Sequence, residues 1–292
     1  FQNNRLVIAQ RLAALNGDSS GDIDEFGFPI GYGKNNQSVL IPAFISAYSG
    51  KSPESISLNA ISKTPLPSWS ISYNGLMNFD FIKESFKRFS LGHAYRSSYT
   101  LNNFKSNLEY NPDNTQLTDD SGNFINEFLF TNVNLVEQFN PLLKIDMELN
   151  NSLQIVMSLK KDRALSLSLD NNLLTESSGT DYSIGLGYRI KDLKFTNRVN
   201  GKRRVSKGDL NIKTDLNFRD NITIIRNLNI LDNKVTAGQK MWSLKTSADY
   251  NLSKSFNAIF FYDHLFSKFA ISTAFPMTTI RAGMTLRYSF GE

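Results

Sequence analysis

The pattern of apolar and polar residues divides the chain into two parts near residue 68. Before that point, apolar residues recur at helical spacing over about 6–15, and a second helix is expected over about 42–49. Asn16-Gly17 and Gly50 are expected to end these helices, because Asn and Gly tolerate the left-handed conformation. Residues 1–67 are therefore expected to form an irregular segment with two short helices, which a proline-containing linker connects to the remainder.

From Trp69 to the C-terminus the period of the pattern is two. Between the alternating stretches only one helical turn is expected, at 80–88, so there are no crossover helices to connect parallel strands. The alternation predicts an antiparallel meander of about fourteen strands over 68–292. They are expected at 68–75, 89–99, 101–110, 124–138, 143–149, 152–160, 163–170, 182–190, 193–199, 210–218, 221–230, 242–252, 255–266 and 279–290.

Three features favour an outer-membrane β-barrel over a soluble sheet. The predicted strands run about 9–14 residues, enough to cross a bilayer when tilted. Short turns, as barrels have on the periplasmic side, alternate with longer connections, as they have outside. The short ones are predicted near 139–141, 161–162, 191–192, 219–221 and 252–254, and the long ones at 111–123, 170–180, 200–208, 231–238 and 267–277. Aromatic residues are expected at strand ends, as in an interfacial girdle: Tyr110, Phe139, Tyr188, Phe218, Tyr288 and Phe290.

The alternation also assigns a face to each side chain, because apolar residues of a barrel strand face lipid and polar ones face the lumen. Expected lipid-facing residues are Ile280, Met284, Leu286, Trp242 and Leu244. Expected lumen-facing residues are Arg281, Thr285, Arg287, Lys245 and Asp249. With the C-terminus in the periplasm, strand parity predicts that loop 200–208 is extracellular, and residues 1–67 are expected to be periplasmic or lumen-associated.

The last strand carries a pattern that resembles the signal by which outer-membrane assembly machinery recognises a barrel. Such signals combine a glycine, alternating apolar residues and terminal aromatics. Here they are Arg281, Gly283, Leu286, Tyr288 and Phe290, with Gly291 and Glu292 after the last aromatic.

Composition narrows the choice of function. The 292 residues are 40% hydrophobic and 20% charged, with a mean hydropathy of −0.30, which excludes a disordered chain and a helical membrane protein. The absence of cysteine excludes disulfide scaffolds and thiol catalysis. The sequence contains none of the hydrolase, metalloprotease or phosphate-loop motifs, and Gly185-Leu186-Gly187 lies within a strand, so we expect neither an enzyme nor a bound cofactor.

The remaining polar candidates favour structural explanations. His93 and His264 follow aromatic residues on apolar strand faces and are expected to be interfacial rings rather than metal ligands. The acids at Asp18, Asp22, Asp24 and Glu25 do not match the EF-hand spacing and are expected to be solvated. The basic cluster Lys202-Arg203-Arg204 with Lys207 has no aromatics for stacking bases, so lipopolysaccharide phosphate or solvent is expected there rather than nucleic acid.

Several stretches resemble the SprA/Sov family, the giant outer-membrane translocons of the type IX secretion system in Bacteroidetes. They are Val39-Leu40-Ile41-Pro42-Ala43-Phe44, Ala47-Tyr48-Ser49-Gly50-Lys51, Pro65-Leu66-Pro67-Ser68-Trp69, Tyr73-Asn74-Gly75-Leu76 and His93-Ala94-Tyr95-Arg96-Ser97. The similarity extends over essentially the whole chain and matches the C-terminal portion of that family. Family members are several times longer and close a single barrel of about 36 strands.

This resemblance implies a wide pore that exports folded proteins and supports gliding motility. The implied partners are the N-terminal remainder of the same barrel, a PorV-like barrel protein, a periplasmic plug protein, secreted cargo and outer-membrane lipid. The chain begins with Phe1, and we expect it to be a processed chain or a piece of a larger one. Two other functions fit the pattern: an autonomous porin of about fourteen strands, and a soluble extracellular β-rich adhesin.

Overall fold

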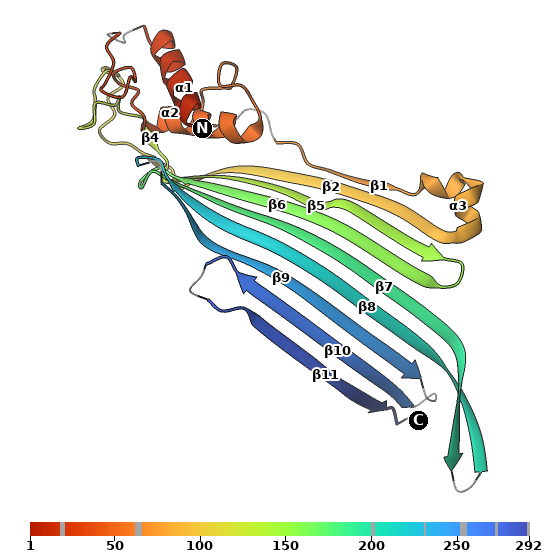
Figure 1. The fold of residues 1–292 in the computed structure, drawn as a ribbon. Coiled ribbons are helices and arrows are strands. Elements are labelled where there is room, and N and C mark those ends of the chain that lie inside the picture. The colour runs from red at the N-terminus through yellow and green to blue at the C-terminus, as the bar shows by residue number, and fades with distance from the viewer. Residues whose placement is uncertain are drawn as a thin grey trace.

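The structure is a computed structural model that describes residues 1–17, 21–61, 66–199, 202–230, 232–251, 256–271 and 274–290. Its main feature is an open antiparallel sheet of nine strands (Figure 1), in the order β1-β2-β5-β6-β7-β8-β9-β10-β11. The strands are β1 (Trp69–Tyr73), β2 (Phe86–Asn102), β5 (Asn132–Leu149), β6 (Leu153–Ser168), β7 (Leu173–Val199), β8 (Lys202–Asn227), β9 (Asp232–Asn251), β10 (Phe256–Phe269) and β11 (Met277–Tyr288). The prediction of antiparallel β-structure is confirmed. The sheet is not closed, and β1 and β11 lie at opposite edges.

The described strands are fewer and longer than predicted. Four expected turns, at 139–141, 161–162, 191–192 and 219–221, lie inside continuous strands, and β7 alone has 27 residues. Register shifts between Phe139 and Leu143 and between Ile190 and Leu193 accommodate two of these breaks in the pattern. Alternation weakens wherever both faces of a strand are polar, although the backbone ladder continues. The sequence pattern therefore predicted two strands where the structure has one.

Tight turns replace several expected loops. Residues 150–152 join β5 to β6 and 169–172 join β6 to β7, with Ser152 and Asn172 at positive φ. The expected strand over 101–110 is also wrong, because β2 ends at Asn102 and a separate pair of short strands follows, β3 (Lys105–Ser106) and β4 (Phe128–Leu129). The predicted turn at 252–254 lies outside the described residues.

The two ends of the sheet differ in what they carry. At the end of the sheet next to the N-terminal segment, which we call the helix end, β2, β6, β8 and β10 end and β5, β7, β9 and β11 begin. Between β1 and β2, η1 (Gly75–Asn78) and α3 (Asp80–Ser85) lie at the other end, together with the C-terminus (Figure 1). The end of β7 and the start of β8 also lie at the C-terminal end. The prediction that loop 200–208 and the C-terminus lie on opposite sides is therefore wrong, because it counted a turn at 219–221 that does not exist.

Two helices form most of the N-terminal segment, α1 (Gln2–Leu15) and α2 (Gln37–Ser49). α2 begins five residues earlier than predicted, because the Asn36 side chain accepts a hydrogen bond from the Ser38 N–H at 2.8 Å. Gly50 ends it in the left-handed conformation at φ 71°, as predicted. The first helix ends at Leu15, directly before Asn16-Gly17, as predicted. Asn16 caps it with φ −90°, outside the left-handed region, and its side-chain amide donates to the Tyr32 hydroxyl at 3.2 Å.

α2 packs directly on the sheet. Leu40, Ile41 and Phe44 are at most 1% exposed. They form one buried cluster with residues of β5, β6, β7 and the β8–β9 turn: Val133, Leu135, Leu165, Leu167, Leu174 and Leu228. A second cluster, which includes Ile8, Val39 and Ala43, joins α1 to the other side of α2. Burial of this apolar surface holds the N-terminal segment against the helix end of the sheet.

We expect Phe44→Ala to loosen α2 from the sheet, because truncation of a buried Phe costs about 3–5 kcal/mol. Amide hydrogen exchange of α2 in the purified full chain should accelerate at least about 100-fold, while the β7 amides keep their protection. Leu15→Ala is the control, since Leu15 is 75% exposed at the end of α1. Equal exchange of α2 in the two variants would contradict this packing role.

Candidate functional site

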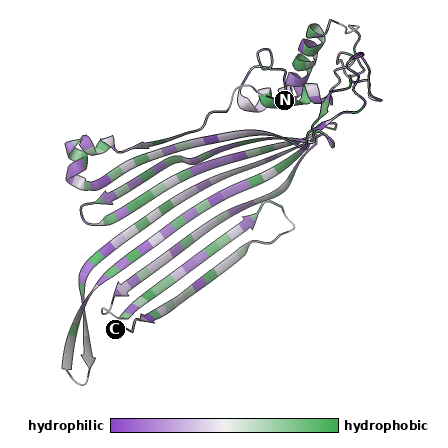
Figure 2. Cartoon of the chain, turned by 180° about the vertical axis from the view of Figure 1, so that it is seen from behind, coloured by the Kyte–Doolittle hydropathy of each residue, from purple (hydrophilic) through white to green (hydrophobic). Residues whose placement is uncertain are grey.

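The register of the sheet gives it two chemically different faces. Residues directly opposite one another on neighbouring strands have their side chains on the same face. Tyr182 pairs with Phe218, Phe218 with Trp242, and Trp242 with Phe266. We name the face that carries this row the apolar face and the opposite one the polar face. Figure 2 shows the resulting alternation of hydrophilic and hydrophobic residues along the strands.

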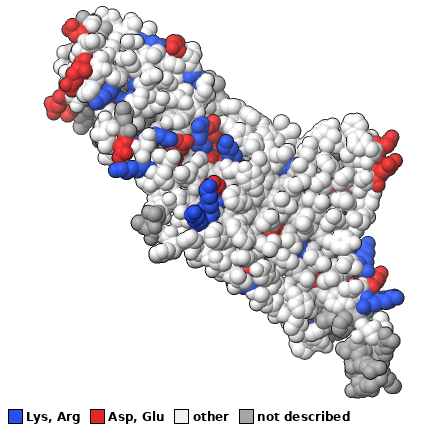
Figure 3. Space-filling view, in the orientation of Figure 1, with Lys and Arg blue, Asp and Glu red and all other residues white. Residues whose placement is uncertain are grey.

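The apolar face carries an exposed apolar band. Among its members, Ile184, Leu216, Phe260 and Met284 are 41–53% exposed. The five expected lipid-facing residues all lie on this face: Ile280 opposite His264, Met284 opposite Phe260, Leu286 opposite Ala258, and Trp242 and Leu244 opposite Phe266 and His264. Figure 3 shows a wide part of the sheet with few charged side chains. An apolar surface of this extent needs an apolar environment.

Aromatic residues border the band on both sides. Tyr182, Phe218, Trp242 and Phe266 form the row nearer the helix end. Toward the C-terminal end of the sheet lie Tyr188, Tyr250, Phe256 and Tyr288, on four different strands. The distance along β9 from Trp242 to Tyr250 is eight steps of about 3.3 Å, or about 26 Å. The nine residues from Trp242 to Tyr250 are at the lower end of the about 9–11 that a tilted strand needs to cross a bilayer.

The aromatic residues lie in rows across the sheet rather than at strand ends. Phe139, Tyr188 and Phe218 are inside β5, β7 and β8, and Tyr110 lies outside the strands. Phe290 follows β11 with a 91% exposed ring. Tyr288 is the last residue of β11, as predicted. For Phe139, Tyr188 and Phe218 the predicted strand-end placement is wrong, because their strands continue beyond the apolar band.

The polar face carries mixed charge. Arg281 pairs with Asp263 at 3.0 Å, Arg219 with Asp181 at 3.5 Å, and Arg88 with Asp146 at 2.9 Å. The other expected lumen-facing residues lie on this face too: Lys245 opposite Asp263, Asp249 opposite Ile259, Thr285 opposite Ile259, and Arg287 opposite Asn257. The register therefore groups the two predicted sets on two faces; which face meets lipid stays a prediction.

Small residues on the polar face lie under longer side chains. A Cβ at Gly185 would meet the Asp215 carboxylate at 3.0 Å, and one at Gly283 would meet the Phe261 ring at 2.7 Å. Gly283 belongs to the predicted assembly signal on the edge strand β11, with Arg281, Leu286 and Tyr288. Phe290 continues this group after the strand, its ring 4.9 Å from that of Tyr288.

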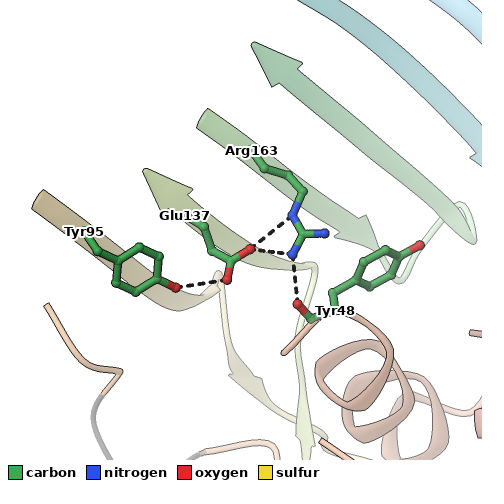
Figure 4. A network of polar contacts seen from close by, with 4 residues as sticks. All are labelled: Tyr48, Tyr95, Glu137 and Arg163. Atoms are coloured by element: carbon green, nitrogen blue, oxygen red, sulfur yellow. Dashed lines mark hydrogen bonds and ion pairs between the residues drawn. The ribbon is translucent and has the colours of Figure 1, made fainter. Parts of the chain in front are cut away.

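A polar network lies beyond the band, where α2 meets the sheet (Figure 4). The Tyr95 hydroxyl donates to Glu137 at 3.0 Å, and Arg163 donates to the same carboxylate through Nε at 3.1 Å and through Nη2. Nη2 also donates to the carbonyl of Tyr48 at 2.9 Å. This carbonyl is in the last turn of α2, where the helix dipole is negative. Arg163 therefore joins the end of α2 to β5 and β6.

A second ion pair supports this junction. Arg226 and Glu176 lie 2.5 Å apart and, like Leu174 and Leu228, belong to the apolar face near α2. Burial raises the pKa of the Tyr48 hydroxyl. The positive charges of Arg226 and Arg163 oppose this rise, and the negative charge of Glu176 adds to it. The sequence analysis predicted no role for Glu137, Arg163, Glu176 and Arg226. Glu137, Arg163 and Glu176 all fall on the apolar phase of their strands, and a charge in that phase is the signal that marks the border of the band.

The remaining candidates have structural surroundings. The His93 ring lies between Trp69 and Phe139, and its Nδ1 is 2.6 Å from the carbonyl oxygen of Leu142. The His264 ring lies 4.5 Å from Trp242. In the part of the chain that the structure describes, no group of three or more His, Asp or Glu side chains could hold a metal ion.

The predicted loop candidates are only partly described. Asp24 accepts backbone hydrogen bonds from Phe26 and Phe28, each 2.8 Å long. Asp18 lies outside the described residues, as do the side chains of Lys202, Arg203 and Arg204. Among the described helices, none has the length and apolar character of a membrane span. No protein-family model matches the chain, and no curated protein matches it at a significant level.

Two neighbouring residues on β11 test the assignment of the faces. We expect Met284→Arg to block membrane assembly, because Met284 lies inside the apolar band opposite Phe260 and an Arg on the lipid face near the bilayer midplane costs about 2–4 kcal/mol. Thr285→Arg places the same charge on the polar face and should assemble normally. The measurement is the yield of protease-resistant protein in the outer membrane. Equal yields would reverse or remove the assigned strand phase.

Proposed function

We propose that this chain is a section of the wall of a wide outer-membrane β-barrel that conducts folded proteins across the membrane, as a member of the SprA/Sov family of type IX secretion translocons. The observation that carries the proposal is the open sheet with one aromatic-bordered apolar band and one polar, charge-mixed face. Such a sheet suits a wall with lipid on one side and an aqueous lumen on the other.

The unpaired edges support a wall section rather than a complete barrel. The residues of β11 are exposed along its whole length, and β1 pairs with only five residues of β2. In lipid, unpaired N–H and C=O groups cost several kcal/mol each, so both edges need partner strands. The remaining strands of the larger barrel would supply them, and the resemblance adds a PorV-like protein, a periplasmic plug and secreted cargo as partners.

The number of strands argues against an autonomous porin. In an up-and-down meander of nine strands, the first and last strands run in the same direction. Closing this sheet on itself would require a parallel pair between β1 and β11, whereas single-chain bacterial barrels have an even number of strands, all antiparallel. A soluble adhesin would in turn expose the apolar band to water, against the hydrophobic effect.

For the orientation of the wall section, we take the C-terminus to be periplasmic, as predicted from the sequence. With β11 ending in the periplasm, the helix end of the sheet is extracellular. Helix α2 then covers the outer surface of the wall above the membrane, rather than lying in the periplasm or the lumen as expected from the sequence. In the same orientation the β7–β8 hairpin tip is periplasmic.

Cysteine labelling tests this orientation, since the protein has no native thiol. Ile230→Cys, at the helix end, should react with a membrane-impermeant maleimide on intact cells, because residue 230 is 70% exposed. Val205→Cys, in the β7–β8 hairpin with 55% exposure, should react only after the outer membrane is permeabilised. The opposite pattern would invert the proposed topology.

A deletion in the native host tests the function. Removing residues 69–292 should leave folded secretion substrates in the periplasm and abolish gliding, while uptake of small hydrophilic solutes stays unchanged. Reintroduction of the intact gene is the control. A loss of solute uptake with normal secretion would favour the porin, and normal results in both assays would leave only the adhesin.

A further inference from the structure

The apolar face carries a row of basic residues immediately beyond the aromatic row, on the side of the helix end. Its members lie two residues along the strands from the aromatic row. They are Thr180 on β7, Asp220 on β8, Lys240 on β9 and Lys268 on β10, next to Tyr182, Phe218, Trp242 and Phe266 respectively. Lys161 of β6 lies opposite Thr180 and extends the row. Two residues along a strand cover about 6.6 Å. This row, which we call the basic row, is therefore at the depth where lipid headgroups meet an aromatic girdle.

The charges of the basic row are not balanced within the sheet. Lys240 pairs with Asp220 at 3.2 Å, and neither Lys161 nor Lys268 has an ion-pair partner among the described residues. Lys240 and Lys268 lie directly opposite one another on β9 and β10. Two like charges in this position destabilise a sheet unless an anion lies between them. The row thus carries three cations and one carboxylate.

Neighbouring rows differ in charge. In the next row toward the helix end, Arg163 is paired with Glu137. The Arg226–Glu176 pair lies still closer to the helix end. On the membrane side the next row is aromatic. Among the side chains that the structure describes, the unpaired positive charge on the apolar face is therefore concentrated at one depth, next to Tyr182 and Trp242, whose polar atoms can also bind headgroups.

We infer that the basic row binds the phosphate groups of an outer-leaflet phosphorylated glycolipid of the lipid A type. The inference rests on the proposed function, which makes the helix end extracellular. Lysine is suited to this ligand, because its aliphatic part lies along apolar surface while its ammonium reaches the headgroup. The site replaces the one expected from the sequence at 202–207, since that hairpin lies at the C-terminal end.

The test uses the purified full-length protein that contains this chain, in detergent at low salt, with synthetic diphosphorylated lipid A as the probe and native mass spectrometry as the readout. We expect Lys161→Gln with Lys268→Gln to weaken binding about 25-fold, at about 1 kcal/mol per lysine. The lipid with both phosphates removed should bind wild type and variant equally.

The matched control is Lys160→Gln with Lys245→Gln, which removes the same charge from the polar face and should change binding less than about twofold. Lys161→Arg with Lys268→Arg should retain binding, which separates loss of charge from misfolding. Inorganic phosphate at millimolar concentration should not compete, and effective competition would indicate a free-anion site and overturn the inference.

Equal weakening by the Lys161/Lys268 and Lys160/Lys245 pairs, or no weakening by either, would also overturn it. These outcomes differ from a failure of the proposed function. If the apolar face does not meet a membrane, the wild-type protein binds neither form of the lipid, whereas a failure of this inference alone leaves lipid binding that does not depend on phosphate.

Discussion

The backbone hydrogen-bond register of the sheet is the constraint on which the other features depend. Each inner strand is held between two neighbours, so a side chain on one strand has a fixed partner on the next. Because the side-chain period is two, a shift of one residue would move a strand's apolar residues to the other face. The row from Tyr182 to Phe266 spans four strands only because every register between them agrees. The apolar band, its aromatic borders and the basic row all follow from that agreement.

The border of the band is a change of environment along continuous strands. β5 and β6 carry Leu143 and Leu159 in the band, Glu137 and Arg163 beyond it, and Leu135 and Leu165 under α2. All six side chains are on the same face. Charged and apolar side chains can share this face because the surroundings change along the strands. In the proposed arrangement they change from lipid, through the headgroups, to the covering helix.

Helix α2 is held by both kinds of interaction. Phe44 and its neighbours are buried on the sheet, and Arg163 donates to the helix at the carbonyl of Tyr48. In the proposed orientation this helix covers strand surface that extends above the bilayer and would otherwise expose Leu135, Leu165 and Leu174 to water. The N-terminal segment then completes the outer surface of the wall, and the polar face stays free to line the pore.

The sequence by itself determined the β-class, the antiparallel pairing and the phase of each strand, because alternation depends only on the period of the backbone. Met284 and Thr285 are thus on opposite faces in any register. It also located the C-terminal end of α2, through Gly50, and α3, although α3 ends at Ser85 and the last three residues of the predicted turn at 80–88 belong to β2. Only the tertiary structure decided how many strands there are: at Phe139 and Ile190 bulges carry the ladder through positions where the alternation fails. The network of Tyr95, Glu137 and Arg163 and the basic row were equally hidden, because they join residues whose neighbours are set by register and not by position in the chain. The end of the sheet at which each loop lies was also decided only by the tertiary structure, because one wrongly predicted turn moves every earlier loop to the opposite end.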